Sequence, residues 1–316
     1  MKNVKRMLAF ALALLTLAAL PVAGLAADEA AKPEQAPEYL AAAAEVTETG
    51  TDWLLVKTEE GETVRLNTGD AWFVDNASGT PVDAGSVKAG DRIYCYTSAA
   101  TTFSLPPQRA AICILTNVGK EDVPGHLLTV KSRTAETSCM ALNCGNVILR
   151  VPFDAPVVPL RTRERLNATD LTVGTVLLAW YDVMTLSLPA QATADRVVVL
   201  DKAVHTVTVK TQDAGGVAVV PLRETAEALG FTVEWNAVER SVRMTDGVRQ
   251  STVTIGQDSY FYAAAIPGMV GMTAPTSFGC VPAIDAQGRT WVPAAFFELL
   301  GAAGEAGSGT ITFTYA

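Results

Sequence analysis

The stretch from residue 219 to residue 244, VVPLRETAEALGFTVEWNAVERSVRM, constrains the fold more than any other part of the chain. From Leu222 onward, apolar residues recur at helical spacing, which predicts a short helix with one apolar face. Gly230 follows, and a glycine here ends a helix because it accepts a left-handed backbone. Apolar and polar residues then alternate, pass through a turn and resume as far as Thr245. The stretch therefore predicts a strand, a short helix and a β-hairpin in succession.

A second, weaker copy of this unit lies near the end of the sequence. The segment WVPAAFFELLG at 291–301 repeats VVPLRETAEALG at 219–230, and a strand-like segment, TITFTY, follows at 310–315. A unit of this size cannot bury its apolar face alone, so we expect the two copies to pair within one domain. The sequence predicts a two-lobed α+β domain over residues 203–316, made of β-hairpins and two short helices.

The motif VPLRxxAEALGxxVxWN, followed by VPxxFFxLLG, resembles the N-terminal domain of copper amine oxidases as it occurs in secreted bacterial proteins. The resemblance covers residues 203–316 and implies a stalk-like, non-catalytic module, because in the oxidase this domain is remote from the chemistry. The oxidase active site needs an Asn-Tyr dipeptide, whose tyrosine becomes a quinone, and three histidines that bind copper. This chain has no Asn-Tyr dipeptide, and its two histidines are His126 and His205. We therefore expect no amine oxidase activity and no cofactor.

The first 26 residues have the pattern of a secretory signal peptide. Three basic residues precede an apolar run at 7–20, and Gly24-Leu-Ala26 supplies the small residues of a cleavage site. The alternative, a membrane anchor, needs about 20 apolar residues, and this run is shorter. Residues 27–44, rich in Ala, Glu and Pro, resemble a disordered spacer with a helical tendency at 39–44. We expect a secreted protein, extracellular or associated with the cell wall, with no membrane span after cleavage.

Charge narrows the range of partners. The chain has 24 basic and 33 acidic residues, and cleavage after residue 26 would remove three basic residues and no acidic one. An acidic chain repels phosphate backbones, so nucleic acid is excluded as a partner, and the sequence has no basic patch for anionic lipid. A cell-wall or other extracellular polymer remains the expected partner, and the oligomeric state stays open.

The middle of the chain consists of short β-type runs separated by turn residues. These runs fall into two tandem modules, at residues 45–118 and 123–201. Each module should be a small, strongly bent β-barrel or sandwich of five or six strands, similar to OB or SH3 barrels. Together with the C-terminal α+β domain, this predicts a mainly β protein.

Two landmarks indicate that the second module repeats the first. Gly90 in VKAGDRI corresponds to Gly174 in LTVGTVL, and the loop SLPPQ at 104–108 corresponds to SLPAQ at 187–191. The loop is either a binding loop or a connection that proline stiffens. The duplication favours the second interpretation, because a repeated loop more often preserves fold geometry than chemistry.

The five cysteines suggest two disulfides. In an exported chain, Cys139 and Cys144 fit a disulfide across a tight turn better than zinc, because no second Cys or His pair lies nearby. Cys95 and Cys113 flank the first SLPPQ loop and would face each other on adjacent strands, which leaves Cys280 unpaired. The alternative is that all five are small buried hydrophobic residues. We expect no metal site.

The sequence contains no convincing catalytic constellation. His126 begins one strand and His205 lies in another, and neither is near a nucleophile elbow. We therefore expect a protein that is not an enzyme.

Four aromatic residues of the C-terminal domain are candidates for a surface that stacks on sugar rings: Trp235, Tyr260, Tyr262 and Trp291. Strand alternation would bury some of them, and each Trp fits a core position as well.

Two function classes remain. One is a non-catalytic cell-envelope protein, a stalk or adhesion module, and the other is a soluble extracellular small-ligand-binding or sensing protein. The first should co-sediment with purified envelope, whereas the second should not.

Overall fold

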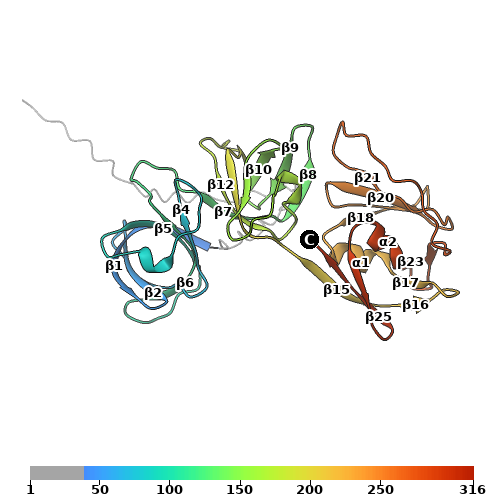
Figure 1. Cartoon of the computed structure of the whole chain (residues 1–316), viewed down its shortest axis with the longest axis horizontal. Helices are drawn as coiled ribbons and strands as arrows, with labels where there is room; N and C mark the ends of the chain where they lie inside the picture. The colour runs from blue at the N-terminus through green and yellow to red at the C-terminus, as the bar shows by residue number, and fades with distance from the viewer. Residues whose placement is uncertain (1–38) are drawn as a thin grey trace, which may run out of the picture. The chain divides into compact units, whose positions relative to one another are not determined.

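A computed structural model describes the protein from residue 39 to residue 316 (Figure 1). The fold is mainly β, and its two α-helices are short: α1 (Leu222–Ala228) and α2 (Ala295–Leu299). The predicted fold class is therefore confirmed. The predicted signal peptide, residues 1–26, and the spacer residues 27–38 lie outside the described residues.

The helical tendency expected at residues 39–44 is wrong, because these residues form the first half of strand β1 (Tyr39–Gly50). This part of β1 pairs antiparallel with β5 (Arg92–Ser98), so a neighbouring strand decides the conformation of an alanine-rich segment. Ala44 and Val46 face inward and are buried. The predicted spacer, residues 27–44, therefore extends too far toward the C-terminus.

The first β unit is a closed sheet. Its strands follow the order β3-β2-β1-β5-β6-β4, and an additional parallel pairing between β3 and β6 closes five of them into a ring. Buried side chains such as Val56, Leu66 and Ile93 form its core. The other strands are β2 (Trp53–Thr58), β3 (Thr63–Asn67), β4 (Trp72–Asp75) and β6 (Gln108–Thr116), and a 3-10 turn, η1, spans Ala84–Ser86.

The second β unit contains two four-stranded sheets, ordered β13-β10-β9-β8 and β11-β14-β12-β7. Here β13 and β14 each pair parallel with an earlier strand, as β6 does with β3 and β4 in the first unit. Leu142, Leu149 and Leu177 lie in its core. The elements are β7 (His126–Thr129), β8 (Ser132–Ala135), β9 (Cys139–Asn143), β10 (Val147–Pro152), β11 (Val157–Pro159), η2 (Ala168–Asp170), β12 (Val176–Trp180), β13 (Ala190–Thr193) and β14 (Arg196–Asp201).

The two β units share a hydrophobic cluster. It combines Val74 and Leu115 of the first unit with Trp180 of the second. The buried Asn76 side chain accepts hydrogen bonds through Oδ1 from the Gly125 N–H (2.9 Å) and from the Trp180 Nε1–H (3.0 Å). The two units are therefore packed together as well as connected.

The C-terminal part of the chain forms three small sheets around the two helices. The first strand, β15 (His205–Lys210), pairs antiparallel with the last strand, β25 (Thr310–Tyr315). The other sheets follow the orders β16-β17-β23-β22 and β18-β19-β20-β21. Their strands, with β24 next to β25, are β16 (Gln212–Asp213), β17 (Ala218–Pro221), β18 (Thr232–Asn236), β19 (Ser241–Thr245), β20 (Arg249–Thr254), β21 (Ala263–Ala264), β22 (Ala283–Ile284), β23 (Thr290–Pro293) and β24 (Ala303–Ala306).

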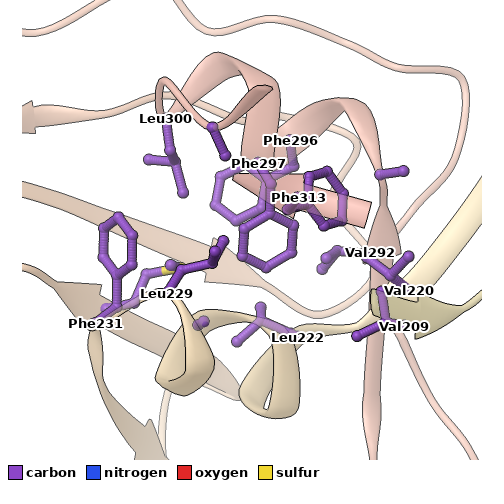
Figure 2. Close-up of a cluster of buried hydrophobic side chains, with 14 of the residues drawn as sticks. Val209, Val220, Leu222, Leu229, Phe231, Val292, Phe296, Phe297, Leu300 and Phe313 are labelled. Carbon is purple, nitrogen blue, oxygen red and sulfur yellow. The ribbon is translucent and has the colours of Figure 1, made fainter. Parts of the chain in front are cut away.

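An aromatic core holds these sheets and helices together. Figure 2 shows Phe296 and Phe297 of α2 and Phe313 of β25 grouped with Leu222 and Leu229 from the α1 segment. All five side chains are almost completely buried. The apolar residues of the helical stretch therefore face this core, as the sequence predicts.

Candidate functional site

The structure does not bring the four predicted aromatic residues onto one surface. Tyr260 is completely buried, and its hydroxyl donates to the Cys280 carbonyl (2.8 Å). Tyr262 packs against the same core, and Trp291 is only 8% exposed. Trp235, at 44% exposure, is the member of the set that solvent reaches freely.

Trp235 lines a groove with a volume of about 620 Å³. The groove lies between α1, β18 and the hairpin of β22 and β23, and its apolar lining includes Leu222, Val233, Val242 and Ile284. Its size falls within the range of about 300–1,000 Å³ that is typical of ligand clefts. An apolar lining beside charged groups can bind an amphipathic ligand.

Charged side chains also line this groove. Arg223 and Glu227 are one helical turn apart on α1 and form an ion pair with 2.8 Å between Nη1 and Oε1. Arg223 also donates to the carbonyl of Val233 (3.1 Å) and so connects the helix with β18. Because both side chains are more than half exposed, a ligand can reach them.

On the other side of the groove, Asp285 holds the side chains of Arg289 and Trp291 in place. Its carboxylate accepts hydrogen bonds from Trp291 Nε1 (2.9 Å), from Arg289 Nε (2.8 Å) and from backbone N–H groups of the turn. The Trp291 bond, together with the bonds from Arg289 and the turn, lowers the pKa of Asp285 to about 2. The Arg289 guanidinium also lies over the Trp291 ring, 5.4 Å from its centroid. Asp285 and the Trp291 ring therefore position Arg289, a groove-lining cation that could not be selected from the sequence.

Two sheet edges border the groove. β18 lies at one end of its sheet and pairs with β19, and β22 lies at one end of its sheet and pairs with β23. An edge strand presents backbone donors and acceptors on its outer side. The groove therefore offers an aromatic face, charged groups and backbone polar groups to an extended ligand.

The two disulfides suggested by the sequence are not formed, because the five cysteines are free thiols in the structure. Cys95 belongs to the core of the first barrel, whereas Cys113 belongs to the cluster shared by the two β units, on the other face of the sheet. Opposite Cys113 on β5 stands Tyr96.

Cys139 and Cys144 are separated by strand β9 rather than joined by a tight turn. Five residues of extended strand span on the order of 15 Å, whereas the Cα atoms of a disulfide lie within about 7 Å. The buried-cysteine alternative fits the structure, since Cys95, Cys113 and Cys139 are buried.

Both histidines make contacts that are typical of structural residues. His126 stacks on Tyr181 with 4.2 Å between ring centroids, and burial lowers its pKa. His205 contacts the Val173 carbonyl through Nε2 (2.8 Å). Within residues 39–316, no group of three or more His, Cys, Asp or Glu side chains is placed to hold a metal ion. Over the same residues, no helix has the length and apolar character needed to cross a membrane.

Known proteins similar to this chain match it only in part. A curated relative, a protease inhibitor of Brevibacillus choshinensis, is 34% identical over 79 residues, which are 25% of this chain and 21% of that protein. The chain thus spans about a fifth of this relative's length. Among solved structures, a chain described as drosophila Unr CSD456 aligns with 76% of this chain and 98% of its own length at 11% identity. The TM-score of this alignment is 0.17.

The C-terminal part of the chain also matches a family model. The model describes the copper amine oxidase N-terminal domain, and the match covers residues 198–313. It includes the groove and both helices, and it concerns the non-catalytic N-terminal domain of these oxidases. The resemblance expected from the VPLRxxAEALG motif is confirmed, and residues 198–313 are similar to the copper amine oxidase N-terminal domain.

Proposed function

We propose that this protein is a non-catalytic, exported binding protein of the cell envelope that holds an extended wall or extracellular polymer in the Trp235 groove. The observation that carries the proposal is the exposed Trp235 indole in an apolar groove that the ion-paired Arg223 and Glu227 also line. An indole provides a broad apolar face, which suits the flat face of a sugar ring. Groove-lining charges and the remaining backbone polar groups at the outer edges of β18 and β22 would hold the polar groups of the same ligand.

Three further observations support an envelope role. The first 26 residues have the pattern of a secretory signal peptide. Residues 198–313 resemble a stalk-type domain that does not take part in oxidase chemistry. The excess of acidic over basic residues makes a nucleic-acid partner unfavourable. We therefore place the protein outside the cell, on or near the cell wall.

The test is co-sedimentation of the mature chain, residues 27–316, with purified peptidoglycan sacculi at moderate salt. We expect the wild-type protein to sediment with the sacculi and Trp235→Ala to bind at least ten-fold more weakly, as expected for a central aromatic contact. Trp235→Phe retains a flat ring and should keep part of the affinity.

Val238→Ser is the matched control, because Val238 is exposed in the same hairpin and lies outside the groove lining. It should bind like the wild type. Equal binding by wild type and Trp235→Ala would show that the Trp235 groove does not bind the sacculi. No sedimentation of the wild-type chain would refute binding to the wall.

A second candidate is a soluble extracellular protein that binds a small ligand, and the groove volume favours it as well. Under this alternative the protein would stay in the supernatant of the sacculus assay. A small-molecule thermal-shift screen would then give a hit that Trp235→Ala abolishes and Val238→Ser does not.

A further inference from the structure

The two SLPxQ loops have the same internal hydrogen-bond pattern. In the first loop, the Gln108 N–H donates to Thr102 Oγ1 (3.0 Å), Thr102 Oγ1 contacts Ser104 Oγ (2.8 Å), and Ser104 Oγ donates to the Pro106 carbonyl (2.8 Å). The Thr102 N–H also donates to the Gln108 carbonyl (3.1 Å). The loop is therefore held together by its own polar groups.

The second loop reproduces each of these contacts. The Gln191 N–H donates to Thr185 Oγ1 (2.8 Å), Thr185 Oγ1 contacts Ser187 Oγ (2.7 Å), and Ser187 Oγ donates to the Pro189 carbonyl (2.8 Å). The Thr185 N–H donates to the Gln191 carbonyl (2.9 Å). In both loops the Thr and Ser residues contribute their hydroxyl groups, and Pro and Gln contribute backbone groups, to this pattern.

The structural role of the loops leaves their tips unexplained. Leu105 and Leu188 are 97% and 95% exposed, and the residues two positions earlier, Phe103 and Leu186, are fully exposed. None of these four side chains packs against either β unit. A loop kept only for its shape would accept polar residues here, and large apolar side chains in water disfavour solubility. The repeated apolar pair at each tip therefore indicates a contact with something apolar.

The chemistry of the tips indicates what this contact is. Residues 98–108 and 183–193 contain no charged side chain. The Thr and Ser hydroxyls at each tip are already bonded within the loop. Each tip thus presents exposed apolar groups, with little cost for removing its side-chain polar groups from water. A protein partner would leave this surface without a directional polar contact, whereas the interface of a lipid bilayer requires none.

We propose that the apolar tips of the two SLPxQ loops insert into the interface of a lipid bilayer with an uncharged surface. The acidic excess of the chain disfavours approach to anionic lipid, so electrically neutral headgroups are the better fit. The second loop also exposes Val183 and Met184 beside its tip, next to the exposed Asp182, and so offers more apolar surface than the first. This binding is separate from polymer binding in the Trp235 groove.

The test uses the mature chain, residues 27–316, and sedimentation with phosphatidylcholine vesicles. We expect the wild type to bind, Phe103→Ser/Leu105→Ser to bind several-fold more weakly, and Leu186→Ser/Leu188→Ser to bind more weakly still. Addition of phosphatidylglycerol should weaken binding at low salt, and high salt should remove this difference. Val238→Ser removes an exposed apolar side chain outside the loops and should bind like the wild type.

Insertion itself is measured with Leu188→Trp. Its emission should shift to shorter wavelength on vesicle addition and should be quenched by brominated lipid. Because the replaced side chains contact no core residue, the variants should keep the wild-type melting temperature. The proposal is overturned if the wild type stays with the supernatant, or if the Ser variants bind vesicles as well as the wild type does. Sacculus binding in the groove assay would be unaffected by either result.

Discussion

Arg133 and Asp246 form an ion pair with 2.8 Å between Nη2 and Oδ2, and each side chain is 4% exposed. Arg133 lies on β8 of the second β unit, whereas Asp246 follows β19 of the C-terminal domain. The guanidinium also donates to the backbone carbonyls of Asp246 and Thr169, both at 2.6 Å. The Tyr315 hydroxyl donates to the same carboxylate oxygen (2.6 Å). A buried, fully bonded ion pair therefore joins the second β unit to the C-terminal domain.

Removal of one partner of this pair should strongly destabilise the protein. In Arg133→Met the Asp246 carboxylate stays buried without its counter-ion, and such a loss costs about 3–5 kcal/mol. Urea unfolding followed by circular dichroism measures the change. Arg223→Met is the control, because its exposed ion pair with Glu227 contributes less than about 1 kcal/mol. Equal losses in the two variants would contradict this account of the buried pair.

The same carboxylate should make stability depend on acid pH. Burial alone raises the pKa of Asp246, but Arg133, two backbone N–H groups and the Tyr315 hydroxyl outweigh burial and lower the pKa below 3.8. A carboxyl group with a lower pKa in the folded state stabilises the fold above its unfolded pKa, and this contribution is lost as the pH falls through the folded value. As the pH falls below about 4, Asp246→Asn should lose stability with a shallower slope than the wild type. Parallel slopes in urea titrations at each pH would exclude this contribution.

Thiol labelling should distinguish buried cysteines from disulfides. Burial raises the pKa of Cys95 to about 11 and that of Cys144 to about 12, and it raises the pKa of Cys113 further. Since the thiolate is the reactive form, we expect Cys280 to react first with Ellman's reagent at pH 8 in the folded protein. In denaturant without reductant, all five cysteines should react. A single reactive thiol under those conditions would instead support the two disulfides that the sequence suggested.

Asn76 should be essential for packing between the two β units. Replacement by Ala leaves the Gly125 N–H and the Trp180 Nε1–H without their acceptor. A buried unpaired donor costs about 1–3 kcal/mol, so Asn76→Ala should lower the melting temperature and change the Trp180 fluorescence. Ser78→Ala, at an exposed position of the same turn, is the control and should change both quantities less. An unchanged melting temperature for Asn76→Ala would show that water replaces the lost acceptor.

Strongly patterned elements of this fold could be predicted from the sequence. The helix expected from Leu222 to Leu229 is observed as α1 over Leu222–Ala228, and Gly230 follows with φ at +88°. Strands β2 and β3 belong to the short β-type runs that the sequence predicts for the first module, and in β3 (TVRLN) apolar and polar residues alternate regularly. In these segments local preference and tertiary packing favour the same conformation.

The segments that were predicted wrongly are those whose conformation is determined by pairing with a neighbouring strand. The alanines of β1 favour a helix locally, but β5 pairs with them. β24 (Ala303–Ala306) has the sequence AGEA and is exposed, and the sequence instead favours a turn over residues 304–309. It is a strand because it pairs with β25. β9 contains the residues between Cys139 and Cys144 and was predicted as a turn.

The candidate site also combines a feature visible in the local sequence with others that depend on residues distant in the chain. Trp235 could be selected from the sequence as a possible binding residue, because it is an aromatic residue in an alternating strand. The groove could not, because its opposite wall carries Arg289, far along the chain from α1. Tyr260 and Trp291 could not be separated from Trp235 before their packing was known. Aromatic type is visible in a sequence, whereas exposure depends on contacts with distant residues.

The pairing of the first and last strands of the C-terminal domain determines how this domain would respond to mechanical force. β15 and β25 are antiparallel, and His205, at the start of one strand, is opposite Tyr315, at the end of the other. The two ends of the domain therefore lie side by side. A pull that separates these ends loads the strand pair from one edge, so its hydrogen bonds break one after another rather than all together. Because Val209 of β15 and Phe313 of β25 belong to the hydrophobic core, a stalk built this way would open its core from the edge at which the two ends meet.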